Sequence, residues 1–155
     1  MEWMILPFKR YADFEGRSRR MEYWMFSLLY GVLTAVLAGP FVVVAMGSFF
    51  ASFSSPGAGE EMFAKAYGLP MIGIILWVVF ALAALIPGIA VAVRRLHDRD
   101  MSGWWFLGFF VAGFLPYVGL LASIAFLVLM LLPGTPGSNR FGVDPKDPYA
   151  EDVFA

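Results

Sequence analysis

Three long, uninterrupted apolar stretches constrain this chain more than any other feature of its sequence. They cover residues 23–53, 67–93 and 104–132, and none of them contains Asp, Glu, Lys, Arg or His. Each is longer than the roughly 20 residues that a helix needs to cross the hydrocarbon core of a bilayer. The sequence therefore predicts an all-α, polytopic membrane protein with three to four membrane-embedded helices.

The composition agrees with this prediction and limits the chemistry. Hydrophobic residues make up 60% of the chain and charged residues 15%, against roughly 45–50% and about 25% in soluble domains. A formal net charge of −1 gives no reason to expect a nucleic acid partner. With no cysteine and one histidine, the chain has no His/Cys cluster for a metal. We therefore expect no metal site and no cofactor.

The basic residues predict which side of the membrane each segment faces. Most lie before the first apolar stretch (Lys9, Arg10, Arg17, Arg19, Arg20) or after the second (Arg94, Arg95, Arg99). The connector between these stretches carries Lys65 beside two glutamates. By the positive-inside rule, the N-terminus and the segment after the second stretch are cytoplasmic.

Three segments follow from this pattern. Residues 1–22 alternate aromatic and basic residues, which suits a cytoplasmic amphipathic lead-in lying in the headgroup layer. Residues 23–132 form the transmembrane domain, with predicted spans at about 23–50, 68–93, 104–115 and 117–132. Residues 133–155 are rich in Pro, Gly and polar residues, which predicts an extended tail.

The third apolar stretch allows two interpretations. As one helix it would be about 43 Å long, which exceeds the hydrocarbon core, and Pro116 would interrupt its hydrogen bonding. It is either one kinked span that leaves the tail outside, or a hairpin of two short helices that returns the tail to the cytoplasm. We favour the hairpin.

Small residues and prolines predict how the spans pack and bend. Small residues recur at four-residue spacing in the first span (Gly31, Ala35, Gly39) and in the second (Ala84, Gly88, Ala92). In membrane helices this spacing is typical of contact faces. Pro40 and Pro87 are expected to kink the two spans.

The segment "RRLHDRDMSGWW", residues 94–105, is the best candidate for a functional site. His97 beside Asp98 is a conceivable general base, but sequence neighbours on a helix point in different directions. We therefore assign no catalytic residue and expect the imidazole to bond backbone or a headgroup phosphate.

The remaining charges predict an ion network or a binding surface. Acidic residues contribute nothing to orientation but can pair with arginines across helices; Arg140 matches Asp98 or Asp100, and Asp144 matches Arg94 or Arg95. The candidate residues for this network, or for binding anionic headgroups or a partner, are Arg17, Arg19, Arg20, Glu22, Arg94, Arg95, His97, Asp98 and Arg140. Expected partners are the bilayer with its anionic phospholipid headgroups, and a second copy of the chain or another membrane protein.

Five blocks in order resemble a known family. They are "FEGRSRRMEYW" (14–24), "RRLHD" (94–98), "SGWW" (102–105), "LPYVG" (115–119) and "PGSNRFGVDP" (136–145). They are similar to the signature of YhaH-type small bacterial inner-membrane proteins, a family of unknown function. The resemblance implies an all-helical fold in the bacterial inner membrane and no assigned reaction. Two positions depart from the pattern: Arg99 stands where a small polar residue is typical, and Met101 where a basic or polar residue is typical.

Taken together, the sequence predicts a binding, regulatory or structural component of the inner membrane with a cytoplasmic basic face. The alternative is a subunit of a small oligomeric pore or transporter, although no ionisable residue lies inside an apolar stretch to couple transport. A membrane enzyme that uses His97 is the third interpretation.

Overall fold

The computed structural model describes residues 2–55 and 57–146, and these residues form seven α-helices. No strand occurs within the described residues. An isolated β-bridge there joins Asn139 to Gly142. The chain divides into two compact units, Met1–Phe26 with Ile86–Ala155 and Ser27–Leu85. We describe each unit by itself.

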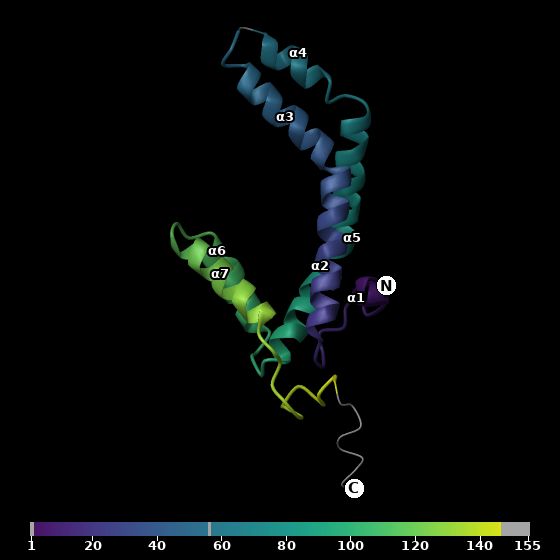
Figure 1. Cartoon of the computed structure of the whole chain (residues 1–155), viewed down its shortest axis with the longest axis vertical. Helices are drawn as coiled ribbons and strands as arrows, with labels where there is room; N and C mark the ends of the chain where they lie inside the picture. Colours follow the sequence, from purple (N-terminus) through teal and green to yellow (C-terminus); the bar gives the residue numbers. More distant parts are fainter. Residues whose placement is uncertain (1, 56, 147–155) are drawn as a thin grey trace. The chain divides into compact units, whose positions relative to one another are not determined.

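The first unit contains all nine candidate site residues. It comprises α1 (Glu2–Lys9), the beginning of α2 (Arg20–Leu37), the end of α5 (Leu69–His97), α6 (Trp104–Gly113), α7 (Val118–Leu131) and the segment that follows (Figure 1). Phe26 is buried in its core, and its ring lies 5.4 Å from that of Phe8. Gly88 brings α5 close to α2, since a Cβ there would lie 3.5 Å from the Phe26 ring.

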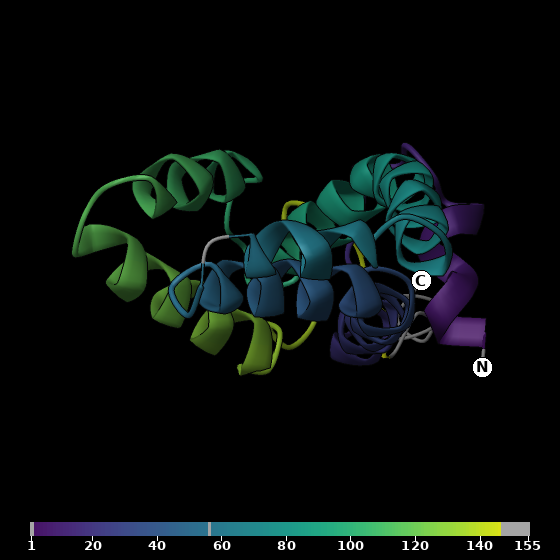
Figure 2. The same cartoon turned by 90° about the horizontal axis from the view of Figure 1, so that it is seen from above.

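The third apolar stretch forms two helices rather than one. α6 and α7 lie side by side (Figures 1 and 2), and Phe126 of α7 packs against the rings of Phe106 and Phe109, at 6.1 and 5.5 Å. The turn between them contains Pro116, followed by Tyr117 with a positive φ of 62°. This is the hairpin that the sequence favoured, and its place in a membrane stays a prediction.

The second unit contains the rest of α2, then α3 (Gly39–Ala51), α4 (Ala58–Ala64) and the beginning of α5. α2 and α3 form a bend of 53°, with Pro40 in the first turn of α3, where proline costs no helical hydrogen bond. The indole of Trp77 donates to the hydroxyl of Thr34 at 3.1 Å. α4 packs on α3 (Figure 2) and lies in the connector between the first two apolar stretches.

The two predicted contact faces behave differently. Ala84 and Ala92 are buried and Gly88 faces Phe26, so the face on α5 is a contact face. The contact face predicted on the first span is wrong, because Cβ atoms at Gly31 and Gly39 would meet open space. The close approach in that part of the chain occurs instead at Gly73, where a Cβ would collide with the carbonyl oxygen of Leu37.

By length and composition, α5 is the one described helix that is long and apolar enough to cross a membrane alone. α2 and α3 meet the same test only when they are taken together as one bent span. α6 and α7 are apolar but shorter. At 1.5 Å per residue they measure about 15 and 21 Å, less than the hydrocarbon core of about 30 Å.

Candidate functional site

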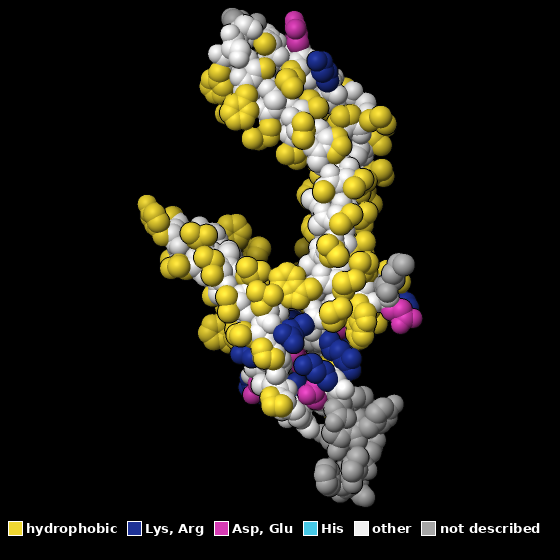
Figure 3. Space-filling view, in the orientation of Figure 1, with side chains coloured by type: hydrophobic (Ala, Val, Ile, Leu, Met, Phe, Trp, Pro, Cys, Tyr) yellow, Lys and Arg dark blue, Asp and Glu magenta, His cyan; other side chains and the backbone are white. Residues whose placement is uncertain are grey.

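A cluster of buried charges lies in the first unit, where α5 ends. We call it the RRLHD network; it consists of Arg17, Glu22, Arg94, Arg95 and Asp98, all of which are buried. Charged side chains gather around this end of the unit, whereas α6 and α7 expose hydrophobic side chains (Figure 3). Burying a charge costs free energy unless it is paired, so the partners of each residue decide what the network does.

The first buried pair joins α2 to α5. A terminal nitrogen of Arg94 donates to Oε1 of Glu22 at 2.7 Å, and the Ser18 hydroxyl donates to the other carboxylate oxygen at 2.8 Å. Arg94 also donates to the backbone carbonyl of Asp13, and its own carbonyl accepts the N–H of Ser18 at 3.1 Å. The segment before α2 is therefore bound to α5 through one arginine.

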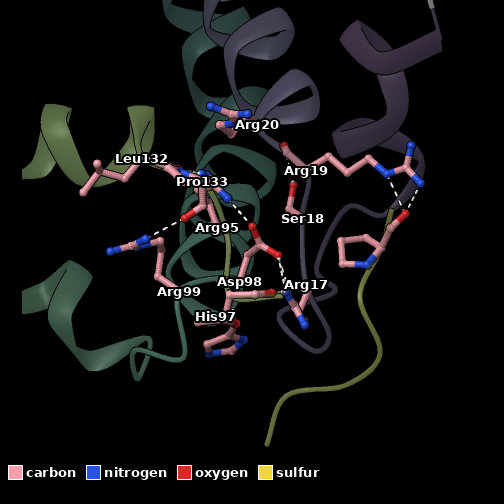
Figure 4. Close-up of polar contacts among 12 residues, drawn as sticks. Arg17, Ser18, Arg19, Arg20, Arg95, His97, Asp98, Arg99, Leu132 and Pro133 are labelled. Carbon is pink, nitrogen blue, oxygen red and sulfur yellow. Dashed lines mark hydrogen bonds and ion pairs between the residues drawn. The ribbon is translucent and has the colours of Figure 1, made fainter. Parts of the chain in front are cut away.

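The second buried group is centred on Asp98. Arg17 donates to Oδ1 of Asp98 through Nε at 3.0 Å and forms an ion pair with it, a terminal nitrogen lying 2.9 Å from the same oxygen, while Arg95 donates to Oδ2 (Figure 4). Both carboxylate oxygens thus accept hydrogen bonds from guanidinium groups. Asp98 does not pair with its sequence neighbour His97, so the general-base arrangement considered from the sequence has no orienting carboxylate there.

Arg17 also holds the segment that follows α7. Its two terminal nitrogens donate to the backbone carbonyls of Gly137 at 2.5 Å and Thr135 at 2.6 Å. The backbone N–H of Thr135 in turn donates to the carbonyl of Asp98 at 2.8 Å. Gly134 passes so close that a Cβ would collide with the Asp98 carboxylate. The tail is therefore packed directly on the network.

Side chains from other elements bind the carboxyl end of α7, where a helix leaves unpaired carbonyl groups and a partial negative charge. Arg95 donates to the carbonyls of Met130, at 3.4 Å, and Leu132. The other donors are Arg20 to Leu131 (3.3 Å) and Trp24 to Met130 (3.4 Å). Arg99 donates to the carbonyl of Pro133 at 2.6 Å (Figure 4). Cationic donors therefore hold the end of α7 against α2 and α5.

His97 is fixed by the tail and by the segment before α2. Its Nδ1 lies 3.2 Å from the carbonyl oxygen of Gly16, which can only accept, so Nδ1 carries the hydrogen. Its ring stacks on Phe141, with centroids 3.9 Å apart and planes 3° apart, and its carbonyl accepts from the Asn139 amide at 2.9 Å. The bond to backbone is the structural role expected from the sequence.

The other candidate arginines lie nearer the surface. Arg140 pairs with Asp100 at 3.1 Å, as charge matching suggested, and its side chain is 60% exposed. Arg19 donates to the carbonyl of Pro145 and lies over the ring of Trp3, 5.6 Å from its centroid. The expected partners of Asp144 were wrong, because Arg94 and Arg95 pair with Glu22 and Asp98 instead.

One partly exposed carboxylate beside the network, that of Asp13, has a lowered pKa. Slight burial raises the pKa of Asp13. Hydrogen bonds from Arg10 and from the N–H of Glu15, together with the charges of Arg10 and Arg94, lower this pKa by more than burial raises it. The net pKa of Asp13 therefore lies below its ordinary value.

Arg94 keeps one buried nitrogen, Nε, for which the described residues provide no acceptor.

Sequence reasoning missed the polar side chains and the backbone groups that complete the site. Ser18 and Asn139 bond to network residues or to the end of α5, and Thr135 accepts from the Asn139 amide at 3.1 Å. A signal was present, because Ser18 and Asn139 lie within the blocks that carry the family resemblance. Within residues 2–55 and 57–146, no group of three His, Cys, Asp or Glu residues could hold a metal ion.

Comparison with known proteins identifies the family. A model of the family described as "Protein of unknown function (DUF805)" matches residues 11–143. The chain belongs to this family. The resemblance inferred from the five sequence blocks is therefore confirmed.

Three relatives from Escherichia coli strain K12 show how far this similarity extends. Inner membrane protein YhaI is 35% identical over 94% of this chain and 97% of its own length. Inner membrane protein YhaH is 37% identical over 94% and 98%, and the uncharacterised protein YiiR is 28% identical over 87% of both chains. No solved structure matches the chain. The similarity to inner membrane proteins thus covers nearly the whole molecule.

Proposed function

We propose that this chain is a multi-pass inner-membrane protein whose N-terminus, RRLHD network and tail all face the cytoplasm, and that it acts as a binding or structural component there. One observation carries the proposal. Side chains of α2 and α5 bind the carboxyl end of α7, so both ends of the α6–α7 hairpin lie at the network. A chain arranged in this way returns its tail to the side from which α6 started.

The charges support the cytoplasmic side. Before α2 and at the end of α5 the chain is rich in arginine, and the positive-inside rule assigns such segments to the cytoplasm. The tip of the hairpin suits the lipid interior, because its exposed residues are apolar or aromatic: Phe114, Leu115, Tyr117 and Val118. With helices of about 15 and 21 Å, the tip would end inside the hydrocarbon core.

Buried pairing supports a structural or binding role for the network rather than a chemical one. Arg17, Arg94 and Arg95 are buried, and apart from Nε of Arg94 their donors bond to carboxylates and carbonyls of the same chain. Buried ion pairs of this kind specify an arrangement more surely than they stabilise it. The cytoplasmic arginines that remain partly exposed, such as Arg19, Arg20 and Arg140, are the ones available to a ligand.

Single-cysteine labelling tests the topology, and the absence of native cysteine makes it direct. A membrane-impermeant maleimide is expected to label Ser54→Cys, in the predicted outer connector, in intact cells. It should label Val143→Cys, in the tail, only after the inner membrane is permeabilised. Labelling of Val143→Cys in intact cells, at the rate seen for Ser54→Cys, would place the tail outside and overturn the proposal.

A further inference from the structure

We propose that a small polar pocket beside the RRLHD network binds a phosphate group, carried by a phospholipid headgroup or free in the cytoplasm. The proposal rests on the proposed function, because it assigns a ligand to the face placed in the cytoplasm. The pocket belongs to the first unit and is formed by the segment before α2, the end of α5 and the tail. Its charged lining consists of Arg17, Arg19, Arg20, Asp98, Asp144 and Lys146.

The size of the pocket fits part of a phosphate group. Its interior is about 20 Å³, and a buried water needs about 10–15 Å³ measured in this way. One phosphate oxygen therefore fits inside, with the rest of the group at the mouth. Arg17 and Asp98 form a buried side of this pocket, and their hydrogen bonds to each other and to the tail fix its shape.

The charge of the pocket favours an anion. Asp98 is already neutralised, because it accepts from both Arg17 and Arg95. The remaining charged lining is Arg19, Arg20 and Lys146 against Asp144 alone. The carboxylate of Asp144 is further engaged by the backbone N–H of Lys146 at 2.9 Å. The pocket therefore carries an excess of positive charge at a protein surface, where it attracts anions.

The cations also keep donors for a ligand. Arg20 uses one terminal nitrogen, in a 3.3 Å bond to the carbonyl of Leu131, and the structure gives its Nε and other terminal nitrogen no partner among the described residues. Within the same residues, the Lys146 ammonium forms no ion pair. Arginine binds phosphate through two parallel hydrogen bonds and lysine adds a point charge. These two side chains are therefore the expected phosphate ligands.

The test measures binding by the full-length protein purified in an uncharged detergent. Calorimetric titration uses three probes: inorganic phosphate, a short-chain phosphatidylglycerol, and the diacylglycerol that lacks the phosphate. We expect phosphatidylglycerol to bind and the diacylglycerol not to bind. Saturable binding of inorganic phosphate, competing with the lipid, would identify free phosphate as a sufficient ligand, whereas binding of the lipid alone would identify the headgroup.

Two matched double variants locate the binding. Arg20→Gln with Lys146→Gln removes two of the four cations that line the pocket and should weaken binding about tenfold or more, the effect of roughly one charge-assisted hydrogen bond. Lys9→Gln with Lys65→Gln removes the same number of positive charges from exposed positions that do not line the pocket, and should change affinity by less than about twofold. Arg20→Lys should weaken binding less than Arg20→Gln, because lysine keeps the charge but loses the two parallel hydrogen bonds.

Two results would overturn the proposal. Equal weakening in both double variants would show attraction to the overall surface charge instead of a site. Failure of the wild-type protein to bind either phosphate compound, while circular dichroism shows it folded, would exclude the ligand. Because binding is measured in detergent, its outcome does not depend on the side of the membrane, which the cysteine labelling tests separately.

Discussion

Replacing Asp98 by Asn tests whether the buried pairs hold the first unit together. The carboxylate is nearly inaccessible, with the residue 5% exposed; it accepts from Nε of Arg17 at 3.0 Å and from Arg95, and a terminal nitrogen of Arg17 lies 2.9 Å from it. Asparagine keeps the shape but removes the charge and turns an amino group toward one guanidinium. Removing one partner of a buried ion pair costs about 3–5 kcal/mol, because the other charge stays buried without compensation. Two arginines lose their partner here, so we expect the upper part of that range.

Asp100→Asn is the matched control, two residues further along the chain. Its pair with Arg140 is of similar length, 3.1 Å, but the two side chains are 47% and 60% exposed. Water screens such a pair, and its contribution should stay below about 1 kcal/mol. The free energy of unfolding of each variant is measured in mixed micelles by titration with a denaturing detergent, followed by helical circular dichroism. Similar losses in both variants would refute the reasoning, since they would mean that water reaches Asp98 as freely as Asp100.

Three further changes follow from the same contacts. Glu22→Gln leaves a buried arginine without its carboxylate and should cost about 3 kcal/mol or more in the same unfolding assay, whereas the exposed Glu15→Gln should be close to neutral; equal values would contradict the pairing. Gly134→Ala forces a methyl group against the Asp98 carboxylate and should destabilise by about 1–3 kcal/mol, and a neutral result would show that the tail shifts without cost. Because the pKa of Asp13 is lowered in the folded state, its stabilisation is present above the unfolded value, near pH 4, and is lost as pH falls through the folded value. Asp13→Asn should therefore flatten the dependence of unfolding free energy on pH in that acidic range, which unfolding titrations at several pH values would show.

Apolar runs and prolines predicted the helices better than they predicted the contacts between them. The turn at Pro116 separates two helices, and Pro40 lies at the bend between α2 and α3. The contact face predicted at Gly31 and Gly39 was wrong, because small residues permit a close approach but do not determine which face of a helix its neighbour contacts. Gly73, which does approach another backbone, belongs to no repeated spacing.

Charge matching found one pair and missed how the others are arranged. Arg140 with Asp100 needs only opposite charges on two exposed segments, and the sequence shows both. Asp98 is instead bound by Arg95, three residues earlier in the chain, and by Arg17. Most other acceptors of the arginines are backbone carbonyls, such as those of Thr135 and Leu132. A carbonyl occurs at every residue, so no pattern of residue types reveals which ones a guanidinium will reach.

The arginines at the carboxyl end of α7 impose an order on how the chain is completed. Arg95 is synthesised well before Met130 and Leu132, whose carbonyls it binds. Until those residues leave the ribosome and the hairpin forms, the guanidinium of Arg95, which is buried in the finished molecule, lacks part of its acceptors. A chain that stops short of α7 would lack these acceptors, so its Arg95 would keep donors unpaired that the finished molecule satisfies.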